Sequence, residues 1–299
     1  MAMAARCIDN LESVLASRVI TFLIGPEKQT FHINEQLVIS CSGVFKRMLT
    51  NGMRESQEGV VELEDQEPHI FTSFIHYILY GNYEASQKIR EMKITVETAD
   101  EEAPVRAKGH YDSLTKHVSQ MRPLVGPTMP YLKYMESFLY QGDAGRLYAK
   151  PSGLPTSESP DLEKSLDPSA ADSQFGLITA HHVKLYVFAD KYDVGELRQL
   201  CLHRLHNTLI RTGLSETGYR YLFEAIAFTF ENTCPGDKIR KLFVQTCVAD
   251  LVLVRHMPGY KDLCCQVPEL AYEMMIELPE YWNSHIYALR DVAGKFLDR

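Results

Sequence analysis

The sequence lacks the features that define membrane and secreted proteins. Its longest apolar run, residues 242–254, is interrupted by Gln245 and Asp250, so it is too short and too polar to cross a bilayer. The opening MAMAARCIDN lacks the apolar core of a signal peptide. The seven cysteines are odd in number and mostly occupy apolar helical positions, which favours buried thiols over a disulfide framework. We therefore expect an intracellular protein, in the cytoplasm, the nucleus or both, with no membrane partner.

Basic sequence is also scarce. The formal net charge is −8, which argues against broad binding to nucleic acid. The short KIRK run at 238–241 lies in a helical pattern and is typical of a solvated helix face. We find no zinc-finger spacing, basic stripe or helix-turn-helix pattern, so no nucleic-acid partner is expected.

Motifs of common enzymes are missing. Residues 25–28 contain a lysine but neither the glycines nor the Ser/Thr of a phosphate-binding loop, and no G-x-S-x-G element occurs. His203 and His206 are one helical turn apart, as metal ligands can be, but solvated histidines near a helix end explain the pair better. His181 and His182 are expected to open a helix. We expect no enzyme activity, no cofactor and no metal.

What the sequence does contain is a compact α+β pattern between residues 18 and 83. Residues 19–25 and 30–33 read as two strands of a hairpin, and residues 60–63 as a third strand. Asn34 and Ser42 are candidate caps of two short helices, and Pro68 opens a long apolar helix that ends at Gly81. The pattern predicts a small sheet covered by helices.

A short helix is expected before this unit. Its apolar side chains recur at helical spacing and form one stripe: Ile8, Leu11, Val14 and Leu15. A helix this short is unstable alone, so the stripe must be buried either on its own domain or on another copy of the chain.

Residues 84–176 change character, because eight of the fourteen prolines lie between Pro104 and Pro168. This Pro/Ser-rich composition predicts a largely disordered insertion, with one short helix at 131–142. After it, residues 177–211 predict an antiparallel helical hairpin. The remaining residues, 212–299, predict an all-helical region with helices at 216–231, 236–255, 268–277 and 279–297.

Several strings in this order resemble the BTB/POZ domain family. FHINEQLVISCSGVFKRML and MRESQEGVVELEDQEPHIFTSFIHYILYGNY are similar to its first strands and helices, and HHVKLYVFADKYDVGELRQLCLHRL to its closing helix pair. ADKYDV is the most specific of these strings. FENTCPGDKIRKLFVQTCVADLV and YKDLCCQVPELAYEMM are similar to the helical extension of fungal BTB proteins. The resemblance implies an α+β BTB/POZ fold, a small mixed sheet flanked by helices, followed by an all-helical C-terminal region.

Two positions depart from the family. Arg18 stands where members usually have an aspartate, and Asn34 where they usually have a histidine. In many members those groups help to form a polar groove between subunits, so we do not expect recruitment of peptides that bind in that groove. Asn34 is expected to act as a helix cap.

The resemblance also implies two interaction sites. Members often form homodimers through the N-terminal helix, which here carries Ile8, Leu11, Val14 and Leu15. Members that bind a cullin carry a hydrophobic residue and a glutamate in the loop before the third strand, the place of Met53 and Glu55. The alternative for Met53 is an ordinary loop residue that packs on its own domain.

The expected function is therefore a non-enzymatic scaffold or adaptor that associates with itself. The domain division runs 1–17, 18–83, 84–176, 177–211 and 212–299. A substrate adaptor of a cullin-type ubiquitin ligase is the alternative, with an unknown protein partner on the C-terminal helices. A transcription-associated regulator without its own DNA-binding motif is a third reading.

Overall fold

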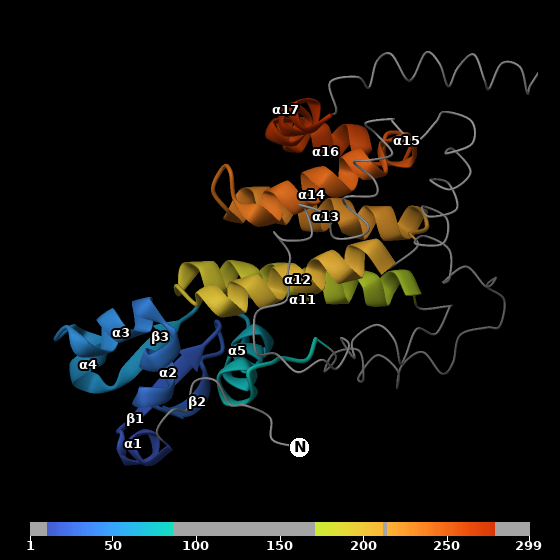
Figure 1. Ribbon diagram of the computed structural model, residues 1–299. Helices are drawn as coiled ribbons and strands as arrows, with labels where there is room; N and C mark the ends of the chain where they lie inside the picture. Colours follow the sequence, from blue (N-terminus) through green and yellow to red (C-terminus); the bar gives the residue numbers. More distant parts are fainter. Residues whose placement is uncertain (1–10, 86–170, 212–213, 279–299) are drawn as a thin grey trace, which may run out of the picture. The chain divides into compact units, whose positions relative to one another are not determined.

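The computed structural model describes residues 11–85, 171–211 and 214–278, and these form two compact units (Figure 1). The first unit contains Leu177–Leu205 together with the described residues before position 86. The second contains the residues from His206 onward and those that precede Leu177 in the same helix. The expected helices at 131–142 and 279–297 lie outside the described residues.

A three-stranded mixed sheet is the base of the first unit. Strands β1 (Val19–Ile24), β2 (Gln29–Asn34) and β3 (Val60–Leu63) lie in the order β2-β1-β3. β1 pairs antiparallel with β2 and parallel with β3. The side chains of Ile20, Phe22 and Ile24 are buried on one face of β1, as the period of two along a strand requires. The small mixed sheet predicted from sequence is confirmed.

Short helices surround this sheet. They are α1 (Leu11–Ala16), α2 (Glu35–Cys41), α3 (Gly43–Thr50), α4 (Arg54–Glu58) and α5 (Pro68–Tyr80). Ser42 caps α3 as predicted, because its hydroxyl accepts a hydrogen bond from the amide of Phe45. Asn34 occupies the N-cap position of α2 as predicted, but its side chain makes no cap bond and donates instead to the carbonyl oxygen of Ser17.

Aromatic packing joins α5 to the sheet and to α3. Pro68 lies in the first turn of α5, and Gly81 ends the helix in the left-handed region at φ 68°. The ring of Phe71 lies 5.1 Å from that of Phe22, and Phe74 lies 5.9 Å from Phe45. Each fully buried side chain of this kind stabilises the fold by roughly 1.5–3 kcal/mol before entropy is counted.

Two long helices, α11 (Ala171–Lys191) and α12 (Gly195–Arg211), follow the insertion. The chain reverses between them at Asp193, whose φ is 53°. The Tyr192 ring stacks on Phe45 at 4.6 Å, so the end of α11 completes the core of the first unit. The predicted hairpin is present, and α11 begins at Ala171, inside the range expected for the insertion.

The histidines of these helices contradict the sequence-based interpretation. His181 and His182 do not open a helix but lie in the middle of α11, where both are buried. His206 of α12 is also buried rather than solvated. His182 Nδ1 lies 2.8 Å from the hydroxyl of Tyr83, and His181 Nε2 lies 3.0 Å from that of Ser73. Burial is tolerated because these polar groups are paired within the protein.

The second unit is all-helical where the structure describes it. Its helices are α13 (Glu216–Asn232), α14 (Lys238–Ala249), α15 (Leu251–Val254), α16 (Tyr260–Gln266) and α17 (Pro268–Glu277). The predicted helix at 236–255 is therefore two helices, with a break at Asp250, which accepts a hydrogen bond from Tyr219. Helix α16 was not predicted. The all-helical C-terminal region is confirmed.

Candidate functional site

An exposed apolar surface lies where α1 meets β1. Leu11 and Leu15, one helical turn apart, are 57% and 68% exposed, and Val19 at the start of β1 is 56% exposed. We call these three residues the N-terminal apolar surface. Large apolar side chains that gather on a surface mark interaction sites more often than single ones do.

The predicted stripe of α1 is thus divided between two roles. Val14 is 4% exposed and packs on its own domain, whereas Leu11 and Leu15 remain open to a partner. Ile8 lies outside the described residues. Val19 was missed from the sequence because it was read only as a strand residue.

Glu55 lies in the short helix α4 rather than in the expected loop, and Met53 is the extended residue that directly precedes this helix. The carbonyl oxygen of Met53 accepts a hydrogen bond from the amide of Gln57 at 3.1 Å. Gly59, at φ 67°, ends the turn and donates to the carbonyl oxygen of Glu55 at 2.9 Å. Met53 is 48% exposed and Glu55 is half-buried. We call residues 53–59 the α4 turn.

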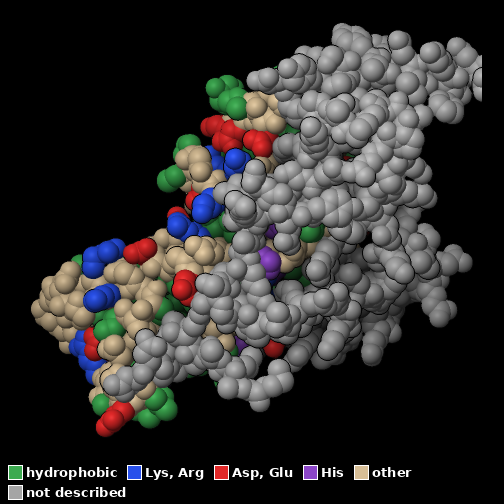
Figure 2. Space-filling model, viewed as in Figure 1, with side chains coloured by type: hydrophobic (Ala, Val, Ile, Leu, Met, Phe, Trp, Pro, Cys, Tyr) green, Lys and Arg blue, Asp and Glu red, His purple; other side chains and the backbone are tan. Residues whose placement is uncertain are grey.

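Charges around the α4 turn are mixed. Arg54 pairs with Glu58 at 3.0 Å, and Lys28 pairs with Glu62 at 3.1 Å. Figure 2 shows basic and acidic side chains interleaved on the visible face of the described residues. Exposed pairs of this kind add little stability. Because they place positive and negative charges side by side, the described surface around Met53 is neither uniformly acidic nor uniformly basic.

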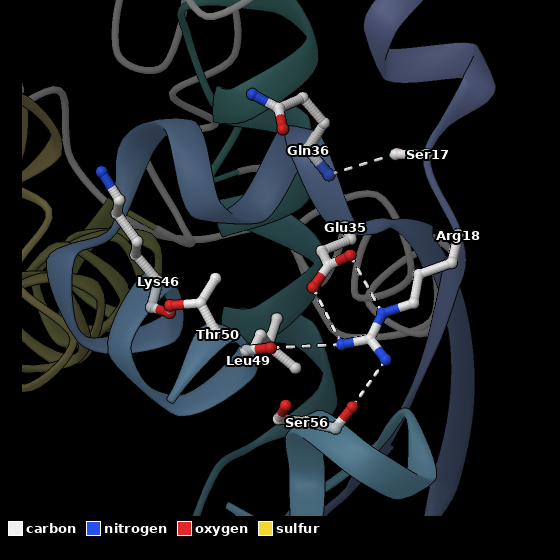
Figure 3. Close-up of polar contacts among 8 residues, drawn as sticks. All are labelled: Ser17, Arg18, Glu35, Gln36, Lys46, Leu49, Thr50 and Ser56. Atoms are coloured by element: carbon white, nitrogen blue, oxygen red, sulfur yellow. Dashed lines mark hydrogen bonds and ion pairs between the residues drawn. The ribbon is translucent and has the colours of Figure 1, made fainter. Parts of the chain in front are cut away.

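Arg18 connects the two candidate surfaces (Figure 3). Its guanidinium makes a two-pronged contact with the carboxylate of Glu35, at 2.9 Å from Nε and 2.9 Å from Nη2. It also donates to the carbonyl oxygens of Ser56 at 2.6 Å and Leu49 at 3.2 Å. An aspartate at this position would have no donor for those carbonyls at neutral pH.

A third exposed apolar face belongs to α17. Tyr272, Met275 and Ile276 are 69%, 70% and 65% exposed. Their i, i+3, i+4 spacing places them on one side of the helix. The sequence alone did not separate them from the core residues of the same helix, Leu270 and Met274.

The buried thiols and histidines form no metal site. Among the residues that the structure describes, no group of three or more His, Cys, Asp or Glu side chains could hold a metal ion. Burial raises the pKa of the Cys201 thiol to about 12. Burial, then the nearby charge of Arg204, keeps the pKa of His182 well below its usual value. These groups act as neutral core side chains.

Comparison with known proteins identifies part of this architecture. No described helix is both long and apolar enough to cross a membrane. A search of curated proteins finds no match to the chain. Residues 19–101 match the family model of the BTB/POZ domain. The chain therefore contains a BTB/POZ domain, a protein–protein interaction module, at residues 19–101.

Proposed function

We propose that this protein is a non-enzymatic BTB/POZ scaffold or adaptor that forms a homodimer through the N-terminal apolar surface. BTB domains commonly mediate self-association. The observation that carries the proposal is the exposure of Leu11, Leu15 and Val19 beside the buried Val14. A two-fold dimer uses the same patch twice, so each exposed leucine would be buried in both copies. Such burial contributes roughly 1.5–3 kcal/mol per side chain.

Size-exclusion chromatography with light scattering tests the dimer. The wild-type chain is expected to show twice the monomer mass at micromolar concentration, and Leu11→Asp to shift it to the monomer. Leu253→Asp is the matched control, because Leu253 is also an exposed leucine, at 47%, but belongs to the second unit. A wild type that stays monomeric at high micromolar concentration contradicts the proposal.

The second candidate function is substrate adaptor of a cullin-type ubiquitin ligase, a role that other BTB domains have. It is supported by the exposed Met53 at the start of the α4 turn, which could enter an apolar pocket on a cullin helix. Glu55 in the first turn of α4 would fix the orientation by charge.

Titration calorimetry with a cullin N-terminal domain tests this role. Met53→Ala and Glu55→Lys should each weaken binding at least tenfold, which corresponds to about 1.4 kcal/mol. Arg54→Ala is the matched control, because Arg54 lies between the two and, among the described residues, pairs with Glu58 and Glu62 of its own unit. Absence of binding by the wild type removes the adaptor role and leaves the dimer untouched.

The exposed face of α17, Tyr272, Met275 and Ile276, is where a protein partner of the C-terminal helices would dock. The relation of this region to the extension of fungal BTB proteins, the domain division and the location in cytoplasm or nucleus stay predictions. A transcription-associated regulator is the third candidate, which chromatin immunoprecipitation that returns no enrichment would exclude.

A further inference from the structure

Two short elements carry the candidate surfaces, and neither is stable by itself. Helix α1 has six residues, of which only Val14 is buried. Helix α4 has five residues and none of them is buried. Helices of this length are unstable without tertiary contacts, so such elements open locally at low cost in free energy. The order of both candidate surfaces therefore depends on the contacts that α1 and α4 make with the rest of the unit.

Arg18 supplies a tether for the α4 turn. The carbonyl oxygens of Leu49, in the last turn of α3, and of Ser56, in α4, lie at helix ends, where the helix itself offers few donors. The guanidinium of Arg18 donates to both. A positive charge is also favourable beside the carbonyl end of a helix. Glu35 fixes the guanidinium from the other side with two bonds, which orients the fork.

The backbone around Arg18 ties the same junction to α1. The amide and hydroxyl of Ser17 both donate to the carbonyl oxygen of Val14, at 3.1 Å and 2.7 Å. The Ser17 hydroxyl also accepts from the amide of Gln36, and the carbonyl oxygen of Arg18 accepts from the amide of Glu35. One two-residue junction thus holds the end of α1, the start of α2 and the α4 turn (Figure 3).

We propose that Arg18 couples the N-terminal apolar surface to the α4 turn, so that self-association through α1 also orders the turn that carries Met53. The inference rests on the dimer proposed above. A partner that fixes α1 stabilises the junction at Ser17 and Arg18, and the same junction holds the carbonyl oxygen of Ser56. Linkage then requires that ordering the α4 turn favours the dimer by the same factor. The equilibrium concerned is that between the ordered and the locally open α4 turn, and binding at either surface favours the ordered state.

Hydrogen exchange of the α4 turn measures this coupling. The amides of Gln57 and Gly59 bond within the turn and report its opening. In the wild type, their exchange should slow by about three- to tenfold when the concentration rises through the dimer dissociation constant measured by light scattering. In Arg18→Ala, measured at a concentration where that variant is also dimeric, the slowing should be absent.

Three variants make the test specific. Arg18→Lys keeps the charge but loses the planar fork, so most of the slowing should disappear. Glu35→Gln weakens the clamp on the guanidinium and gives a second reading if Arg18→Ala does not fold. Arg54→Ala is the matched control, because Arg54 is an arginine of α4 itself that pairs with Glu58 and Glu62. This variant should keep the slowing of exchange.

The outcomes separate the two proposals. A dimer whose α4 turn exchanges at the same rate at every concentration overturns the coupling and leaves the dimer intact. A dimer in which Arg18→Ala retains the full slowing also overturns the role of Arg18. A wild type that is monomeric throughout overturns the dimer, and the coupling fails with it.

Discussion

The hydroxyl of Ser42 donates a hydrogen bond to the carbonyl oxygen of Tyr192 at 2.5 Å, although the two residues are 150 positions apart. The same hydroxyl accepts from the amide of Phe45 at 3.0 Å and so begins α3. The amide of Gly43 adds a bond to the carbonyl oxygen of Asp193 at 3.4 Å. A single buried serine therefore starts a helix and joins the two sequence halves of the first unit.

We predict that Ser42→Ala lowers the free energy of unfolding of the first unit by about 2–3 kcal/mol, because it removes a helix cap and leaves the buried carbonyl of Tyr192 without this donor. Hydrogen exchange of the α3 amides under mild urea measures the loss separately from the second unit. Thr50→Ala, which removes an exposed hydroxyl from the other end of α3, should change the value by less than about 0.5 kcal/mol. Equal effects of the two variants would contradict the prediction.

A side chain at Gly43 is predicted to displace the carboxylate of Asp193 at a cost in stability. A Cβ there would lie 2.3 Å from Oδ2 of Asp193, so Gly43→Ala should destabilise the first unit by about 1–3 kcal/mol. Adding Asp193→Gly should recover part of this loss, since it removes the clashing carboxylate and suits the φ of 53°. Gly195→Ala meets nothing within 4 Å and serves as the control. Thermal unfolding of the wild type, the single variants Gly43→Ala and Asp193→Gly, and the double variant forms a double-mutant cycle, and additive losses would be evidence against the clash.

The buried His182 predicts a loss of stability in acid. Its pKa is lowered in the folded protein, so below about pH 6.5 the unfolded chain binds a proton that the folded chain does not. The free energy of unfolding should therefore fall with decreasing pH, by at most about 1.4 kcal/mol per pH unit from this group. The groups that face it are Tyr83, His181 and Arg204.

His182→Gln should flatten this part of the pH dependence, since glutamine does not titrate. Urea unfolding between pH 7 and pH 5 measures the slope, which is compared between variants because the absolute stability will also change. His32→Gln, which removes an exposed imidazole from β2, is the control. If both variants keep the wild-type slope, His182 is not its source.

The cysteines are predicted to react in two classes. Cys234 and Cys265 are exposed, whereas Cys201 and Cys247 are buried, and burial raises the pKa of both buried thiols. A maleimide at pH 7 should modify the exposed pair within minutes and the buried pair only after unfolding, because the thiolate is the reactive form. Mass spectrometry of peptides from the labelled chain shows the order in which the cysteines are modified. Rapid native-state labelling of Cys201 would show that its helix opens easily.

Local signals predicted the elements whose causes are local. The hairpin followed from β-branched strands around a Gly-Pro turn, and the limits of α5 from Pro68 and Gly81. The cap at Ser42 was also visible, because an N-cap bonds three residues ahead. Its bond to Tyr192 was not, since no local pattern reports a partner 150 positions away.

The errors share that cause. His181 and His182 were expected to open a helix, but their partners Ser73 and Tyr83 are 108 and 99 positions earlier, so no local pattern reports their burial. The α4 turn was read as a loop because the tether from Arg18 spans 38 positions. The stripe of α1 was treated as one surface, whereas only the packing shows that Val14 turns inward and Leu11 outward.

The contact between Phe45 and Tyr192 also determines how early in translation the core of the first unit can be completed. The first 85 residues leave the ribosome with most of one core, but the ring that stacks on Phe45 is made nearly 150 residues later. At roughly 5–20 residues per second, that delay is about 7–30 s. Until then, one side of the Phe45 ring and the hydroxyl of Ser42 lack the partners that they have in the folded unit. The first unit therefore acquires its full core only after α11 has been synthesised.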